Sequence, residues 1–270
     1  MSSTIQSSPV VNPSSTIPSS QLKSAIDRVL ICTTKEPSRF RLNAIKFESD
    51  GSYLKMISTD GHRASVATIP VELPEFQMLV PAADFTAIKK LCRRKKDVIT
   101  VHSTADSLTF ESPKGEKVVV HPVGEIGEFP PIDHVLETQT TGTIPVLDPL
   151  EFRRGIRMGQ IARLCGERNF KTDGFGNLVK IISTPRKMTV YGKAKNNGTR
   201  SVCHMDSNSR STGVSVAVNA NYVLDLLKVM PKDEPIEMGY WKNGTEGVTV
   251  RTNNFHHVLC GITEKRGMSH

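Results

Sequence analysis

The sequence predicts an α+β protein in which antiparallel sheets carry helices on one face. The main observation is a pattern that recurs four times: a short β-type run, a turn residue, and about a dozen residues with apolar side chains at helical spacing. The turn residues are Pro18, Pro81, Pro145 and Asn219. The second observation is that β-rich runs, broken by turn pairs such as Asp50-Gly51, follow each helix. Each repeat therefore predicts one β-α-β-β-β unit.

Each predicted helix has one apolar stripe, and therefore one face that packs on a sheet. In the first helix Leu22, Ile26 and Val29 form this stripe. The corresponding residues of the other helices are Phe85, Ile88 and Leu91, then Leu150, Phe152 and Ile156, then Val223, Leu226 and Met230. A single unit cannot cover its own sheet, so we expect the units to pair, two to a domain.

Four units make two similar domains, in agreement with a length of 270 residues at about 150 residues per domain. We expect the first domain at residues 15–136 and the second at residues 142–265. Between them, Pro130-Pro131 and an uncharged, Thr-rich run interrupt the periodic pattern. Residues 1–14 are rich in Ser, Thr and Pro, which predicts a disordered tail.

The composition excludes several classes of protein. Apolar residues make up 37% and charged residues 23% of the chain, as in ordinary folded soluble proteins. No stretch reaches the roughly 18 to 20 consecutive apolar residues of a membrane-spanning helix, so we expect a cytoplasmic protein without membrane contact. The five cysteines contain no Cys-x-x-Cys pair, which argues against a disulfide framework and against a zinc site.

The formal net charge of +8 favours a polyanionic partner such as nucleic acid. Basic residues lie on the predicted outward faces or flanks of the first three helices, whereas the fourth helix region has more acids than bases. These residues are Lys23 and Arg28, then Lys89, Lys90, Arg93 and Arg94, then Arg153, Arg154 and Arg157. Taken singly, each fits a solvated helix face. If the helices lie side by side, the faces merge into one surface that contacts the backbone of duplex DNA without sequence preference.

No motif for catalysis, metal binding or cofactor binding is complete. A P-loop, His-Glu-x-x-His and Gly-x-Ser-x-Gly are absent from the sequence. His256 and His257 are adjacent on a probable strand, where their side chains point to opposite faces and cannot share one metal. Asp60 and His62 could form half of an acid/base pair, but the Asp-Gly dipeptide between them is typical of a turn. We therefore assign no catalytic residue, metal or cofactor.

Four stretches resemble a known family. ISTDGHRASVATIPVE, preceded by RFRLNAIKFESDGSYLKM, resembles the middle domain of the bacterial DNA polymerase III beta subunit, the sliding clamp. VSVAVNANYVLDLLKVM and EGVTVRTNNFHHVLCGI resemble the last domain of that family. The resemblance runs from about Thr16 to Ile262 and implies the DNA clamp fold, with helices lining a central hole.

The resemblance also implies partners. Six domains close a clamp ring, so a chain with two domains implies a homo-oligomer of three subunits around double-stranded DNA. Family members hold DNA polymerase and clamp loader through short linear peptides in an apolar pocket between the middle and last domains. The matching pocket residues are Leu42, Thr59, Gly61, His62, Arg63, Ala64, Gly247, Val248, Val258, Cys260 and Ile262. The loop Arg39-Phe40-Arg41 matches the place where the family presents basic and aromatic residues to DNA.

The expected function is therefore that of a sliding DNA clamp, a processivity factor and not an enzyme. A closed ring leaves DNA only by opening, so weak phosphate contacts suffice to keep a tethered polymerase nearby. The alternative is a clamp-like adaptor or regulator that binds peptides or DNA without encircling DNA. A third possibility is a hydrolase or nuclease that uses Asp60 and His62.

Overall fold

The computed structural model describes residues 14–34, 40–104, 106–123, 128–164, 177–193, 199–209 and 213–262. The predicted β-α-β-β-β order is confirmed in all four units. The first unit comprises β1 (Ser14–Pro18), α1 (Ser19–Leu30), β2 (Ala44–Ser49), β3 (Tyr53–Thr59) and β4 (Arg63–Pro70). The second comprises β5 (Phe76–Pro81), α2 (Phe85–Leu91), β6 (Val98–Ser103), β7 (Leu108–Glu111) and β8 (Lys117–Val120).

A short helix that the sequence did not predict, α3 (Asp133–Leu136), precedes the third unit. That unit comprises β9 (Gly142–Val146), α4 (Pro149–Leu164), β10 (Leu178–Ser183), β11 (Lys187–Lys193) and β12 (Arg200–Asp206). The fourth comprises β13 (Val214–Asn219), α5 (Ala220–Val229), β14 (Ile236–Asn243), β15 (Thr245–Thr252) and β16 (Phe255–Cys260). We call residues 14–123 the N-terminal half and residues 142–262 the C-terminal half.

Local chemistry explains where the elements begin and end. The side chain of Asn219 accepts a hydrogen bond from the amide of Asn221 (3.0 Å) and so caps α5. Gly51 and Gly244 have φ values of 92° and 71°, a backbone conformation that glycine adopts at little cost, and each sits in the tight turn of a hairpin. The glycine turns are therefore confirmed, whereas the four residues read as turns before the helices lie at or near the ends of strands: Pro18 in β1, Pro81 in β5, Pro145 in β9 and Asn219 in β13.

The first strands of paired units are exchanged. In the N-terminal half, β1 pairs with β6 of the second unit and β5 pairs with β2 of the first, which gives the sheets β1-β6-β7-β8 and β5-β2-β3-β4. The C-terminal half shows the same exchange through β9 and β13. Because each unit completes the sheet of its neighbour, neither unit of a pair has a complete sheet without the other.

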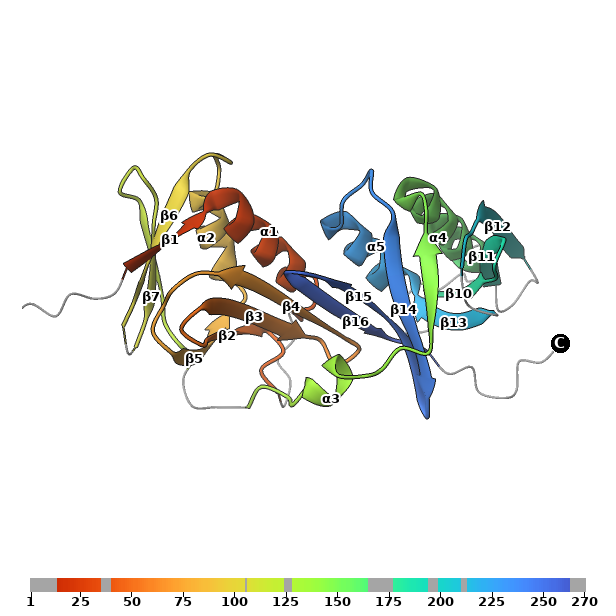
Figure 1. The fold of residues 1–270 in the computed structure, drawn as a ribbon, viewed down its shortest axis with the longest axis horizontal. Coiled ribbons are helices and arrows are strands. Elements are labelled where there is room, and N and C mark those ends of the chain that lie inside the picture. The colour runs from red at the N-terminus through yellow and green to blue at the C-terminus, as the bar shows by residue number, and fades with distance from the viewer. Residues whose placement is uncertain are drawn as a thin grey trace, which may run out of the picture.

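One eight-stranded sheet joins the two halves. Strands β4 and β16 pair antiparallel, with Ala64 opposite Val258 and Ala67 opposite Phe255. Each half has its own hydrophobic core, the first around stacked Phe47 and Phe85 (ring centroids 5.4 Å apart). We call the β4–β16 pairing the joint. It fixes the two cores side by side along one sheet (Figure 1).

The helices α1, α2, α4 and α5 form a row that we call the helix row. Contacts run in the order α2, α1, α5, α4, and α1 lies on β3 and β4 while α4 lies on β11 and β12. Figure 1 shows α1, α5 and α4 on one side of the eight-stranded sheet and α3 on the other. Helix α4 approaches its sheet very closely, since any side chain at Gly192 on β11 would collide with the carbonyl oxygen of Gly159 on α4. Lys23, Lys89, Lys90, Arg154 and Arg157 lie on helices of this row.

None of the helices in the described ranges is long and apolar enough to span a membrane.

Candidate nucleic-acid interface

The helix α4 presents basic side chains as the sequence suggested. Phe152, Gly155, Ile156 and Gly159 are buried against the sheet, and Arg154 and Arg157 are exposed on the other side, with Arg153 half-buried on the flank. One detail of the apolar stripe was wrong, because the Leu150 side chain is 43% exposed. It lies in the first turn, where Asp148 caps the helix by accepting a hydrogen bond from the Leu150 amide (2.8 Å).

Helix α2 ends earlier than the charge pattern suggested. We expected Arg93 and Arg94 on this helix, but it ends at Leu91 and both side chains are exposed in the turn that follows. A longer helix would place Arg93 and Arg94 one turn beyond Lys89 and Lys90, and like charges four residues apart destabilise a helix. The amide of Asp97 instead donates to the Arg94 carbonyl oxygen (3.1 Å) and closes a turn. Lys90 remains on the helix and is exposed.

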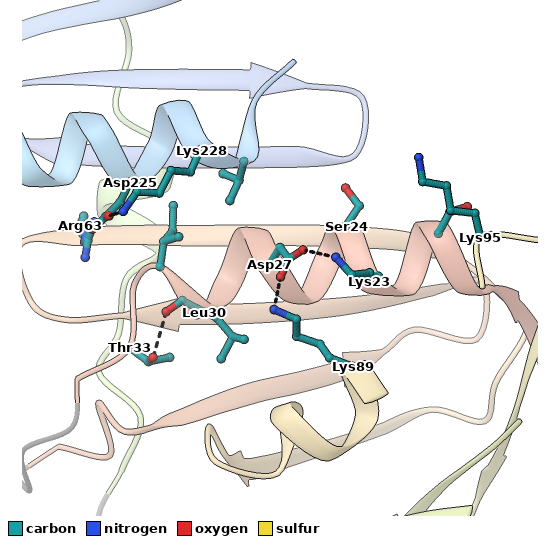
Figure 2. A pocket seen from close by; sticks show the side chains of 13 residues that line it. Lys23, Ser24, Asp27, Leu30, Thr33, Arg63, Lys89, Lys95, Asp225 and Lys228 are labelled. Atoms are coloured by element: carbon teal, nitrogen blue, oxygen red, sulfur yellow. Dashed lines mark hydrogen bonds and ion pairs between the residues drawn. The ribbon is translucent and has the colours of Figure 1, made fainter. Parts of the chain in front are cut away.

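A hollow of about 740 Å³ opens on the helix row where α1, α5 and the end of α2 meet. Four lysines and Arg63 line it together with two acids, and Figure 2 shows them in two groups, one around Asp27 and one around Asp225, with Lys95 apart. The residues are Lys23, Lys89, Lys95, Lys228, Arg63, Asp27 and Asp225. Lys95 and Lys228 were not among the residues predicted to contact DNA.

Lys228 was discounted because acids outnumber bases around the fourth helix. The structure shows that Asp233 and Glu234 lie beyond the end of α5 at Val229, so they do not share its exposed face. Among the described residues, Asp225 is the acid paired with Lys228, with 2.7 Å between Oδ1 and Nζ. The fourth helix therefore adds one exposed lysine to the row.

Arg63 of the Thr-Asp-Gly-His-Arg run links the two halves of the chain. Its side chain is 8% exposed, and its Nε donates to Asp60 Oδ2 (2.8 Å) while its Nη1 donates to Asp225 Oδ2 (3.1 Å) on α5. The guanidinium also lies over the ring of Tyr222, 4.1 Å from its centroid. The arginine that the resemblance assigned to a peptide pocket is thus held at the joint, at the rim of the hollow.

Asp60 stabilises the turn in which it lies. Its Oδ1 accepts hydrogen bonds from the amides of His62 (3.0 Å) and Arg63 (3.1 Å), and its Oδ2 holds the Arg63 side chain. The His62 ring stacks on Tyr222 with 6.2 Å between centroids. No pairing of Asp60 with His62 for acid/base chemistry is formed in this described turn, so the geometry gives the hydrolase alternative no support.

Arg28 makes a second link across the joint. Its Nη1 donates to Asn254 Oδ1 (2.9 Å), and its guanidinium lies 4.9 Å from the centroid of the Phe255 ring. Burial lowers the pKa of Arg28, and no carboxylate among the described residues pairs with it. Arg28 therefore lies at the joint between the halves and not on the open face of the helix row with Lys23.

The residues assigned to a partner-peptide pocket come together at one end of the joint. The Cys260 amide donates to the His62 carbonyl oxygen (2.9 Å), and Ala64 lies opposite Val258. Gly61, His62 and Cys260 are exposed, and Leu42 and Ile262 are half-buried. The others in the set, Thr59, Arg63, Ala64, Gly247, Val248 and Val258, are buried within the sheet.

The linker between the halves packs against this end of the joint. Ile132 forms a small buried cluster with Ile57 and Ala64, and Phe129 and Leu136 pack on it. Pro130-Pro131 were expected only to mark a boundary, and these contacts were not predicted. A signal was present in the sequence, because four apolar residues fall within the short segment from Phe129 to Leu136.

The loop assigned to DNA contact is only partly described. Arg39 lies outside the described residues, whereas the Phe40 side chain is 38% exposed. The amide of Arg41 donates to the Glu128 carbonyl oxygen (3.3 Å), which places this loop beside the linker that leads to α3.

A fully buried histidine lies in the middle of the joint. His257 Nδ1 is 2.8 Å from the Ser65 hydroxyl oxygen, which in turn lies 3.2 Å from the Cys32 sulfur. Burial, with smaller contributions from Arg63 and His256, lowers the pKa of His257 to about 3. Burial also raises the pKa of Cys32 to about 12, so both groups are neutral near pH 7. The described residues contain no cluster of three or more metal-binding side chains.

The burial of His257 predicts a pH-dependent stability. An unfolded histidine has a pKa of about 6.5, so below this pH the unfolded state takes up a proton that the folded state excludes. We expect the free energy of unfolding to fall as the pH drops from about 6.5 towards 3, by about 2 kcal/mol between pH 7 and pH 5 for this residue. Urea titrations of the wild type and of His257→Met at pH 7 and pH 5 measure it. An equal loss in both proteins would contradict the prediction.

Comparison with known proteins identifies the fold and the relatives. Residues 16–120 match the family described as DNA polymerase III beta subunit, central domain. The beta sliding clamp of Salmonella typhimurium is 35% identical over 68 residues, which cover 24% of this chain and 19% of that protein. The beta sliding clamp of Vibrio cholerae is 21% identical over 215 residues, which cover 79% of this chain and 55% of that protein. The matched segments thus cover only part of these relatives.

Solved clamp structures share the fold over nearly the whole chain. The DNA polymerase sliding clamp from Bacillus subtilis superposes with a TM-score of 0.80 at 16% identity, over 96% of this chain and 67% of that chain. The DNA polymerase III beta subunit from Thermotoga maritima gives 0.79 at 17% identity, over 96% and 68%. This chain therefore spans about two thirds of the length of those clamps. The segment 16–120 is therefore similar to the central domain of the DNA polymerase III beta subunit, and the chain as a whole shares the fold of the solved sliding clamps.

Proposed function

We propose that this protein is a sliding DNA clamp, a processivity factor that encircles duplex DNA and tethers polymerase. The observation that carries the proposal is the continuous helix row, α2-α1-α5-α4, with exposed basic side chains along one side of the joined sheets. The phosphate backbone of DNA of any sequence can contact such a surface. Each contact contributes modestly to affinity and is weakened by salt. The assignment gives the protein no catalytic role.

Ring closure needs a second joint like the internal one. The internal joint pairs β4 and β16, the last strands of the first and fourth units. The last strands of the other two units, β8 and β12, both lie at sheet edges and expose Val119 (50%) and Val202 (48%). We infer that β8 of one copy pairs with β12 of the next, in a head-to-tail contact that repeats around a ring.

We propose three copies per ring. With clamp domains at 15–136 and 142–265, a ring of six domains needs three chains of this length. Polymerase and clamp loader would bind through short peptides at the end of the joint where Gly61, His62 and Cys260 are exposed. The two linker side chains Phe129 and Leu136 extend the apolar surface there. We assign this activity to the cytoplasm, where replication proteins meet DNA.

Light scattering tests the ring. We expect a mass of about three times 29.7 kDa for the wild type, and about 29.7 kDa for Val202→Lys, because a lysine on the edge strand disfavours pairing with another strand. The control is Val98→Lys, which changes an equally exposed valine (44%) on a strand inside its sheet and should leave the mass unchanged. A wild-type monomer at micromolar concentration would instead support the adaptor that never encircles DNA.

Retention on DNA tests encirclement. A ring threads over the ends of linear duplex DNA, and bulky proteins attached afterwards to both ends should trap it there in high salt. The same DNA with free ends should lose the protein, because the phosphate contacts are screened. Equal loss from blocked and free ends would contradict the proposal.

A further inference from the structure

Two acids lie among the basic side chains of the hollow on the helix row. Asp27 on α1 and Asp225 on α5 are each in contact with two basic groups (Figure 2). We propose that Asp27 and Asp225 act as built-in counter-charges, which compete with DNA phosphates for these basic groups and keep the hold on DNA weak enough for sliding. This inference rests on the proposed function and specifies how its DNA-facing surface is regulated.

Asp27 forms ion pairs with two lysines from different helices. Its Oδ2 lies 3.2 Å from Lys23 Nζ, one helical turn earlier on α1, and its Oδ1 forms an ion pair with Lys89 of α2. The side chains of Lys23 and Lys89 are 49% and 33% exposed, so both can also reach a phosphate in the hole. Each phosphate contact at these positions must first break a contact with Asp27.

Asp225 forms ion pairs with one exposed lysine and one buried arginine. Lys228 Nζ lies 2.7 Å from Oδ1 and its side chain is 56% exposed, whereas Arg63 holds Oδ2 and is 8% exposed. Only Lys228 can therefore turn to DNA when Asp225 is removed. The two acids are expected to act unequally, with two lysines released by the loss of Asp27 and one by the loss of Asp225.

The physical reason lies in the salt dependence of phosphate contacts. Each additional phosphate contact steepens the plot of log affinity against log salt by about 0.9 and changes affinity about three- to fourfold between 50 and 200 mM salt. A carboxylate beside a lysine pairs with it for part of the time and so weakens the contact of that lysine with phosphate. The weaker contact does not fix the DNA in one place. A clamp gains from this arrangement because topology, and not affinity, keeps it on DNA.

Salt titration of duplex DNA association tests the inference. We expect Asp27→Asn to steepen the salt slope by up to about 1.8 and to raise affinity at 50 mM salt about tenfold, and Asp225→Asn to change the slope by up to about 0.9. The matched control is Glu48→Gln, which frees Lys46 on the face of the sheet opposite the helices. The control changes the net charge by the same amount as Asp27→Asn. Because Lys46 lies away from the helix row, the control should leave the salt slope unchanged.

A double-mutant cycle separates the counter-charge effect from a general charge effect. Lys89→Met should lower affinity more in the Asp27→Asn background than in the wild type, because only the freed lysine engages phosphate fully. Equal slopes for Asp27→Asn, Glu48→Gln and a DNA-binding wild type would overturn this inference while leaving the clamp assignment intact. A wild type that does not associate with duplex DNA at any salt concentration would overturn the proposed function as well.

Discussion

Replacing Arg63 by methionine should cost about 3 kcal/mol of unfolding free energy, because it removes one partner of a nearly buried ion pair. The substitution leaves Asp60 with a side chain 9% exposed and no cation, and it removes the only ion pair that crosses the joint to Asp225 in the described residues. The cation–π contact with Tyr222 is lost at the same time. Urea unfolding followed by circular dichroism measures the change.

A matched variant shows whether burial is the cause. Lys55→Met removes the partner of Asp50, but both side chains are more than 40% exposed, and we expect almost no change in the free energy of unfolding. If Arg63→Met were as mild as Lys55→Met, the ion pairs of Arg63 would not hold the joint. Loss of DNA retention in Arg63→Met with unchanged stability would also count against a structural role and would favour direct contact with DNA.

The repeated fold could be predicted because its signals are local. Turn residues such as Asn219 and Gly51 act within their own few residues, and an apolar stripe identifies the packing face of each helix without knowledge of its partner. The order of elements follows from these signals alone. The exchange of β1 and β5 between sheets could not be predicted, because a strand carries no local mark of the edge with which it pairs.

The candidate site was predictable only in part, for a related reason. The outward direction of Arg154 and Arg157 follows from helix geometry, and the structure places both on the exposed side of α4. Arg28 and Arg63 were also identified as basic residues near a site, but their partners Asn254 and Asp225 are 226 and 162 residues away in sequence. Long-range contacts of this kind engage basic side chains that a helix projection counts as available for DNA.

The end of α2 shows how a local rule can mislead when charge is ignored. Helical spacing extended this helix to Arg94, but four consecutive basic residues and Asp97 favour a turn after Leu91. The change places Arg93 and Arg94 on a projecting turn next to Lys95, which lines the hollow.

Arg93 and Arg94 are two adjacent, exposed basic residues of the proposed DNA surface, and we expect a large effect when both are changed. Reversing both to glutamate should lower affinity for duplex DNA at least tenfold near 100 mM salt, since two phosphate contacts are lost and two repulsions are added. Stability should change little, because both side chains are exposed. Fluorescence anisotropy with a labelled duplex, together with a urea titration, measures both quantities.

The control for that experiment reverses the same number of charges on the opposite face. Lys46→Glu with Lys55→Glu alters two lysines on β2 and β3, where the alternate residues Phe47 and Leu54 point into the core and so direct the lysines away from the helices. If DNA association depends on the helix row, this variant should bind nearly as well as the wild type. A similar loss in both double variants would mean that net charge alone attracts DNA, and that the row of helices does not form the contact surface.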